Sequence, residues 1–315
     1  MANLSYYLLR GFVWLLSLLP FWALYGLADC FFLLVYYIIR YRRKVVRRNL
    51  STSFPEKSEQ EVKQIERRFY RWLCDYAVET MKLLTISDKA LLRRMEFRGE
   101  EQLERVFDEG RNCDIILGHY CNWEWLAALR LTFKRYPDAE LGAIYHPLYN
   151  KAFDRLFIDI RSAHGSLCVA KQDILRELVR LNREKRHYVF GYISDQAPRW
   201  HNIHLWLDFL GHDTPVFTGG ERIMRKKDDA VFYFDMERPR RGKYLCTCKL
   251  VSQHAAQEPE NEITKQFFIM LEQTIRRQPE FYLWTHNRWK RTHEEFDRQY
   301  VMVNGRAIPR EEVKD

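Results

Sequence analysis

The pattern that decides the fold class is an apolar strand that runs into a polar turn, in the segment Cys113-Asp114-Ile115-Ile116-Leu117-Gly118-His119-Tyr120-Cys121-Asn122-Trp123-Glu124. Residues 113–117 have the length and composition of a buried strand. Gly118 and His119 then form the predicted turn, and a helix-like stretch begins near residue 123. Because open α/β sheets bind ligands at the carboxyl ends of such strands, this turn is the first candidate for a functional site.

The same alternation of short apolar runs with charged helical stretches extends on both sides of this segment. Predicted strands cover residues 95–97, 113–117, 141–145, 167–170 and 188–194, and predicted helices cover 100–107, 123–133, 152–163 and 173–183. Residues 231–236 and 244–251 are predicted as a hairpin or adjoining strands, and 262–277 as a closing helix. The sequence therefore predicts an α/β fold with a largely parallel central sheet flanked by helices, in one domain.

The amino-terminal segment is predicted to be a membrane anchor. Residues 11–39 contain a single charged residue, Asp29, and would be about 43 Å long as one helix, more than the ~30 Å hydrocarbon core of a bilayer. Pro20 offers a place for a break, so one tilted transmembrane helix and two shorter embedded helices both fit. We expect an anchor over residues 1–40, a basic juxtamembrane connector over 41–58 and the main domain over 59–315, beginning with an amphipathic helix at 59–84.

The positive charge is concentrated next to this anchor. The chain has 51 Lys and Arg against 42 Asp and Glu, a net charge of +9, and six of the basic residues lie between 40 and 48. This position predicts a cytoplasmic domain, and the charges either hold it at an anionic surface or act only as a stop-transfer signal. It argues against nucleic acid as a partner, which would need a basic face on the folded domain. The seven scattered cysteines favour a reducing compartment and show no zinc spacing.

The chemistry must come from groups other than a nucleophile elbow, a phosphate loop, a dinucleotide fingerprint or a zinc motif, because the sequence contains none of these. His119 and Glu124 are five residues apart and cannot face each other on one continuous helix. If His119 lies in the turn before the helix, a carboxylate inside the helix could orient its imidazole as a base. A satisfied structural histidine is the alternative.

Several blocks of the sequence resemble the lipid A late acyltransferases, a family within the glycerolipid acyltransferase superfamily. The central block, Gly118 to Glu124, is similar to the family's His-x4-Asp/Glu motif. Further blocks that resemble the family are Arg47-Arg48-Asn49-Leu50 with Phe54-Pro55-Glu56, Tyr145-His146-Pro147-Leu148-Tyr149-Asn150 with Arg155, Arg161 and Gly165, Asp195-Gln196 with Phe209-Leu210-Gly211 and Thr218-Gly219, and Trp284-Thr285-His286-Asn287-Arg288-Trp289-Lys290. The chain departs from the family pattern at Cys121, where glycine is usual, and at His146, where arginine is usual.

The resemblance implies a set of roles for these residues. His119 would be the general base that accepts a proton from an acceptor hydroxyl, and Glu124 would orient it. The resemblance adds four expected substrate-binding residues, Asn122, Arg161, Asp195 and Gln196. Asp195 and Gln196 follow the predicted strand 188–194 and would reach the same sheet edge as His119, although a turn or a helix cap explains them equally well.

The resemblance also implies the partners and the location. The donor would be an acyl thioester on acyl carrier protein or on CoA, used as a co-substrate with no bound cofactor. The acceptor would be a phosphorylated glycolipid, namely a lipid A precursor, at the cytoplasmic face of a bacterial inner membrane. The alternatives are a different acceptor (a lysophospholipid, a phosphoinositide mannoside or an amino-acid lipid) and a non-catalytic, membrane-tethered lipid-binding protein.

Overall fold

The chain begins with two apolar helices that meet at Pro20. The computed structural model describes residues 2–303 and 306–312, which leaves the outermost limits of the predicted segments, residues 1 and 315, outside the described residues. Helix α1 (Ala2–Leu18) is followed by α2 (Phe21–Leu33), which continues into the π-helical turn η1 (Leu34–Ile39). Pro20 is the residue before α2, with extended backbone at ψ 156°. Of the two arrangements that the sequence left open, the structure has two helices, and residues Phe21–Ile39 form one helix long and apolar enough to cross a membrane.

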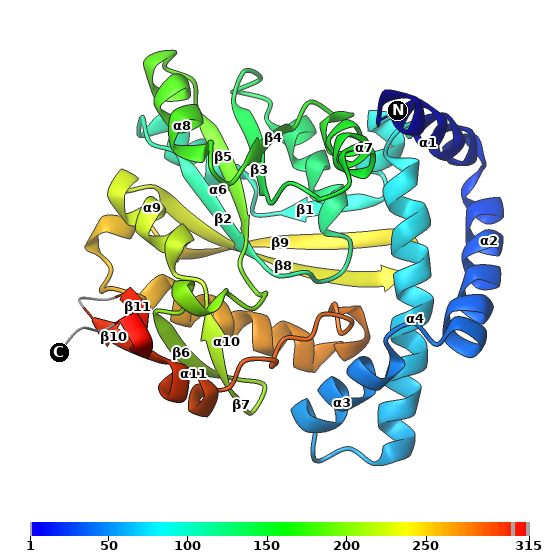
Figure 1. Ribbon diagram of the computed structural model, residues 1–315. Coiled ribbons are helices and arrows are strands. Elements are labelled where there is room, and N and C mark those ends of the chain that lie inside the picture. The colour runs from blue at the N-terminus through cyan, green and yellow to red at the C-terminus, as the bar shows by residue number, and fades with distance from the viewer. Residues whose placement is uncertain (1, 304–305, 313–315) are drawn as a thin grey trace.

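Two further helices connect this segment to the main domain (Figure 1). The predicted connector is largely helical, because α3 (Arg43–Ser53) lies within it. The amphipathic helix α4 (Glu59–Lys82) then starts at a capping box, in which Ser58 and Glu61 each bond the other's backbone N–H, as sequence spacing of this kind favours. The domain boundaries drawn from the sequence stay predictions.

The core of the molecule is a seven-stranded mixed sheet. Its strands, in spatial order, are β1 (Met95–Arg98), β9 (Lys243–Ser252), β8 (Ala230–Arg240), β2 (Cys113–Leu117), β5 (Tyr188–Ile193), β3 (Glu140–Tyr145) and β4 (Leu167–Ala170). All neighbouring strands are parallel except β8 and β9, which form an antiparallel hairpin. The predicted α/β fold with a largely parallel central sheet is confirmed.

One face of this sheet packs against a helix, and the other lines a cavity. On β8, Tyr233 and Asp235 both bond Thr274 of helix α10 (Glu262–Arg277), at 2.8 and 2.9 Å, whereas Phe234 between them lines a cavity on the other face. This alternation is the period of two that a strand imposes on its side chains. The remaining helices around the sheet are α5 (Asp88–Leu92), α6 (Glu101–Asp108), the 3₁₀ helix η2 (Trp123–Thr132), α7 (Lys151–Ser162), α8 (Ile174–Arg183), α9 (Gly219–Lys227) and the short turns η3 (Trp200–Asn202), η4 (Ala255–Gln257) and η5 (Pro279–Phe281).

A small appendage that the sequence did not predict completes the fold. The hairpin β6 (Leu205–Phe209) and β7 (His212–Val216) lies beside α11 (His293–Gln299), the hairpin β10 (Tyr300–Val303) and β11 (Arg306–Pro309), and the turn η6 (Arg310–Glu312). Its contacts include the parallel stack of Trp206 on His293, whose ring centres are 4.4 Å apart. Ile203, Phe296 and Ala307 form its own small buried cluster.

Candidate active site

The candidate site lies where two neighbouring parallel strands end. His119 follows β2, and Asp195 and Gln196 follow β5. The register pairs Leu117 with Ile193, so the two strands end side by side. The prediction that these three residues meet at one edge of the sheet is therefore confirmed.

His119 is held by Asp195. The Nδ1 atom of His119 is 2.6 Å from Oδ1 of Asp195, and the backbone N–H of His119 donates to Oδ2 at 3.1 Å. Asp195 is buried, which raises its pKa, but the charge and hydrogen bonds of His119 outweigh this and leave that pKa below the usual range. An ionised Asp195 keeps the proton of neutral His119 on Nδ1, so Nε2 is the basic nitrogen. The amide of Gln196 lies 3.3 Å from this Nε2.

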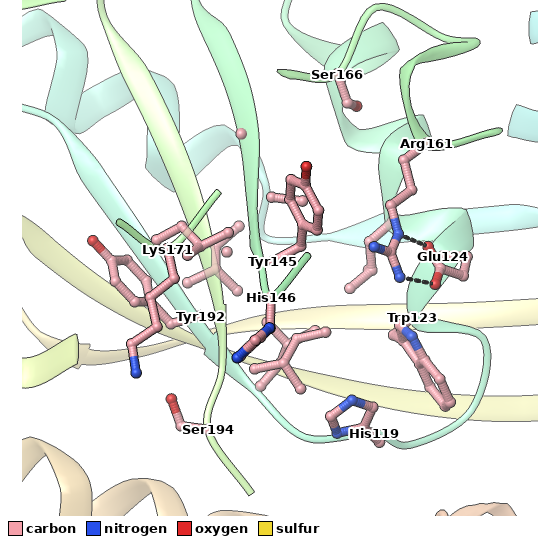
Figure 2. Close-up of a pocket in the computed structure, with 18 of the residues that line it drawn as sticks. His119, Trp123, Glu124, Tyr145, His146, Arg161, Ser166, Lys171, Tyr192 and Ser194 are labelled. Carbon is pink, nitrogen blue, oxygen red and sulfur yellow. Dashed lines mark hydrogen bonds and ion pairs between the residues drawn. The ribbon is translucent and has the colours of Figure 1, made fainter. Parts of the chain in front are cut away.

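Glu124 does not orient His119, which corrects the sequence-based expectation. Both oxygens of Glu124 accept from Arg161 on α7, from Nε at 2.7 Å and from Nη2 at 2.6 Å, and the hydroxyl of Tyr76 lies 3.3 Å from Oε1. Figure 2 shows this pair on one side of Trp123 and His119 on the other. A carboxylate gains more from a two-pronged guanidinium than from a neutral imidazole, so Arg161 takes the partner that the spacing had assigned to His119.

Asn122 is not placed to touch a substrate, contrary to expectation. It is fully buried. Its Oδ1 accepts from the backbone N–H of Trp125 at 3.2 Å and so caps η2, while its Nδ2 donates to Oε2 of Glu79 at 2.8 Å. Asn122 therefore fixes the start of the helix that carries Glu124 and ties it to α4.

Cys121 keeps the turn after His119 in a shape that suits glycine. Its φ is 52°, in the left-handed region that L-residues avoid. The turn is held by a backbone hydrogen bond from Cys121 N–H to the carbonyl oxygen of Phe281, 2.9 Å long. The departure from the family pattern at this position therefore leaves a glycine-like turn conformation in place.

Residues near the carboxyl terminus surround Asp195, and sequence reasoning gave them no role in the site. Tyr282 is buried, and the pKa of its hydroxyl is raised first by burial and then by the charge of nearby Asp195. Arg288 is also buried, which lowers its pKa to about 10 and leaves a cation near Asp195. Burial lowers the pKa of His286 to about 4, so it is neutral at ordinary pH. The block 284–290 could have pointed to His286 and Arg288, whereas Tyr282 lies outside it.

Helix α3 holds this carboxyl-terminal block in place. Asn49, which is buried, donates to the carbonyl oxygens of Trp284 and His286 at 3.1 and 2.9 Å. Arg42 donates to the carbonyl oxygen of Thr285 at 3.1 Å. We call α3 and residues 284–288 the clasp. Two blocks that the sequence placed far apart therefore lie together behind the catalytic candidate.

A cavity of about 750 Å³ opens beside His119 on the face of the sheet opposite α10. Its walls are mainly apolar and come from strands β2, β3, β5 and β8 and helices α7, α8 and α9; they include Ile115, Leu117, Ile144, Ile174, Ile223 and Phe234. Gly219 leaves open space where a Cβ would project. The size and lining are those of a site for a largely apolar small molecule.

The polar residues of the cavity lie on two sides of His119 (Figure 2). Glu124 and Arg161 lie beside Trp123. His146 and Lys171 lie on the opposite side, and these two side chains are exposed to solvent. His146 follows β3, and its Nδ1 is 3.0 Å from the carbonyl oxygen of Pro147. Within residues 2–303 and 306–312, no three His, Cys, Asp or Glu side chains gather as a metal site would require.

Comparison with known proteins agrees with the resemblance. The family described as bacterial lipid A biosynthesis acyltransferase matches residues 2–291. A lipid A biosynthesis lauroyltransferase from Escherichia coli (strain K12) is 24% identical over 282 residues, which is 89% of each chain.

Proposed function

This chain belongs to the bacterial lipid A biosynthesis acyltransferase family, and we propose that it moves a fatty acyl chain from an acyl thioester to a hydroxyl of a lipid A precursor. The observation that carries the proposal is the position of His119. Its Nδ1 is fixed by buried Asp195, and its side chain lines an apolar cavity large enough for an acyl chain.

In the proposed reaction His119 is the general base. As the acceptor oxygen attacks the thioester carbonyl, Nε2 removes its proton, and ionised Asp195 stabilises the imidazolium that forms. The carbon–sulfur bond then breaks, and the imidazolium returns the proton to the departing thiolate. The hydroxyl must first displace the amide of Gln196, which makes Gln196 a candidate to position it.

Glu124 and Arg161 have a different proposed task from the one expected. Because each neutralises the other, they offer the cavity a fixed polar wall rather than a free base. We propose that this pair positions η2 and α7 around the reacting groups. Substrate phosphate is assigned instead to the side of Lys171 and His146, whose side chains reach solvent.

The donor and the location are part of the proposal. An acyl group on acyl carrier protein or on CoA fits an apolar cavity with an accessible mouth, and both donors carry the same thioester. The basic residues 40–48 support a cytoplasmic position at the inner membrane. Some of this charge is used within the fold, since Arg43 and Arg47 both pair with buried Glu66, at 2.9 and 2.8 Å.

Purified variants test the assignment of the base and its partner. We expect His119→Ala and Asp195→Asn each to lower kcat by about 10²–10⁴-fold with little change in folding. Glu124→Gln is the comparison variant, because it removes a carboxylate charge near the site without touching His119. We expect a smaller loss of kcat from it, since it weakens only the pair with Arg161 that positions η2 and α7. Equal activity of Asp195→Asn and the unchanged protein would reject Asp195 as the orienting group, and an active His119→Ala would reject the mechanism.

Lipid analysis tests the acceptor. Deleting the gene should yield lipid A that lacks one acyl chain, detected by mass spectrometry of total lipids, and expression of the His119→Ala variant should not restore it. An unchanged lipid A with another acylated lipid missing would select a different acceptor. No change in any lipid would favour the non-catalytic binding protein.

A further inference from the structure

Helix α1 buries one stripe of side chains and exposes the opposite one. Tyr6, Val13 and Ser17 are buried, while Leu8 and Leu15 are 67% and 60% exposed. The buried stripe packs against α7 and α4. The exposed stripe is apolar, which an aqueous surface does not favour.

Helix α2 is divided in the same way. Leu24, Ala28 and Phe32 are buried, whereas Trp22 and Leu33 are 79% and 55% exposed. Most of the large apolar side chains that are exposed in the described chain belong to these two helices and η1. Two adjoining helices therefore share one apolar outer surface, which we call the anchor face.

The inner side of α2 and η1 lies against the middle part of α4, and the two segments run in opposite directions (Figure 1). The contacts along this length are Tyr25–Glu79, Phe32–Arg71 and Tyr36–Tyr70. The β8–β9 hairpin adds Arg241, which binds Asp29 of α2 at 2.8 Å and Asp75 of α4 at 3.0 Å. Asp29, the one charge in the apolar segment, is thus paired with the domain.

This docking is incompatible with α2 crossing a bilayer. If α2 stood along the membrane normal, the part of α4 beside it would lie at the same depth. Exposed Arg71, which lies over the ring of Phe32, and Arg241, which binds Asp29, would then enter the hydrocarbon. Charged side chains are costly there and are tolerated only in a protein interior or a water-filled cavity. Undocking α2 instead would leave Asp29 in the hydrocarbon without Arg241.

We propose that α1 and α2–η1 lie parallel to the membrane plane and insert the anchor face into one leaflet only. The partner is an anionic phospholipid surface. Its charge is complementary to Arg40 and Lys44, which are exposed next to the end of η1. Interfacial helices of this kind bury their apolar side about 5–10 Å into the boundary between headgroups and acyl chains.

The same orientation brings the cavity to the lipid. Helix α1 is bonded to α7 through Asp159, which accepts from Arg10 at 3.0 Å and from the Tyr6 hydroxyl. Helix α7 and the loop before it supply cavity-lining residues, among them Leu148, which is itself 42% exposed. A lipid acceptor therefore reaches the cavity from the leaflet without leaving its own membrane.

Depth measurements distinguish the two orientations. Single cysteines replace Trp22, Leu33 and Ile38 in a Cys30→Ser background, carry a nitroxide, and are studied by electron paramagnetic resonance in vesicles containing phosphatidylglycerol. The in-plane orientation predicts equal depths for all three labels, within about 5 Å. A label at Arg176→Cys on α8, which lies across the sheet from α2, is the control and should report water (Figure 1).

Two results would overturn the proposal. Labels at positions 22 and 38 that lie in opposite leaflets, about 24 Å apart along the normal, would show a spanning helix. Water exposure of all three labels would show that the anchor face does not bind the leaflet. The measurement needs no catalysis, so its outcome is independent of the acyl-transfer proposal.

Discussion

Cys121 has a backbone conformation that is unfavourable for a residue with a side chain. A left-handed conformation costs an L-residue roughly 1–2 kcal/mol, and the bond from its N–H to Phe281 holds it there. The thiol side chain is buried, so it also contributes packing. The turn that carries His119 is therefore stabilised by its surroundings and not by its own sequence.

Two substitutions at Cys121 should behave differently. Cys121→Gly relieves the backbone strain and loses a small buried group, so we expect the free energy of unfolding to change by less than about 1 kcal/mol, with activity retained. Cys121→Val places a β-branched residue at positive φ and should lower that free energy by about 2 kcal/mol or more. Urea titration of both variants measures this, and equal stability of the two would contradict the strain argument.

Individual site residues could be predicted from the sequence only in part. His119 was found because it follows directly after an apolar run that predicts a strand. Asp195 and Gln196 follow another such run, but their role in the site was expected from the family resemblance. The partner of His119 was predicted wrongly, because Glu124 binds Arg161, which is 37 residues away in the chain, and not His119. Spacing along one segment carries no information about groups that a second helix brings to the same place.

At the scale of the elements, Glu79 of α4 is the centre of a buried hydrogen-bond network. This buried carboxylate accepts hydrogen bonds from Tyr25, Tyr244 and Asn122, at 2.9, 2.6 and 2.8 Å, and Arg238 lies 3.8 Å away. It joins α2, β8, β9 and the start of η2. One side chain thus links α2, the central sheet and the helix that carries Glu124.

Removal of this acceptor should destabilise the whole arrangement. Glu79→Ala removes the carboxylate that lies near Arg238 and accepts from Tyr25, Tyr244 and Asn122. We expect a loss of about 3–5 kcal/mol in the free energy of unfolding. Glu79→Gln keeps the shape and one acceptor oxygen and should lose clearly less. Chemical denaturation in detergent compares the two; an Ala variant as stable as the Gln variant would mean that the donors find other partners.

The elements themselves were predicted well where apolar runs were continuous. The strands at 113–117 and 167–170 and the helix at 262–277 have the predicted limits. The β6–β7 hairpin was missed because β7 carries His212, Asp213 and Pro215, a composition that favours loops over strands. Its tight turn uses Leu210 and Gly211, both at positive φ, and only the glycine signals that geometry in a sequence.

For the whole molecule, burial of His286 makes stability depend on pH. Its pKa falls to about 4, below the ordinary 6.5, because burial disfavours the charged ring. The unfolded chain therefore binds more protons than the folded one between these values, and the free energy of unfolding rises with pH across that window. The contribution is at most about 3 kcal/mol, since each pKa unit corresponds to 1.36 kcal/mol.

A His286→Asn variant isolates this contribution. We expect the unchanged protein to lose stability more steeply than the variant between pH 6.5 and pH 4, measured by urea titration at several pH values. The buried Asp195, whose pKa is also lowered, acts in the same direction at lower pH and is present in both proteins. Parallel curves for the two proteins would contradict the burial argument.

The clasp has a consequence for the order in which the protein is made. Asn49 forms its hydrogen bonds with Trp284 and His286, which lie more than 230 residues later in the chain. The ribosome synthesises α1 and α2 early and the block 284–288 close to the end, so a nascent chain with both helices formed still lacks the residues that surround Asp195. The surroundings of Asp195 are therefore completed only when translation is almost finished, and a chain truncated before residue 284 would lack them.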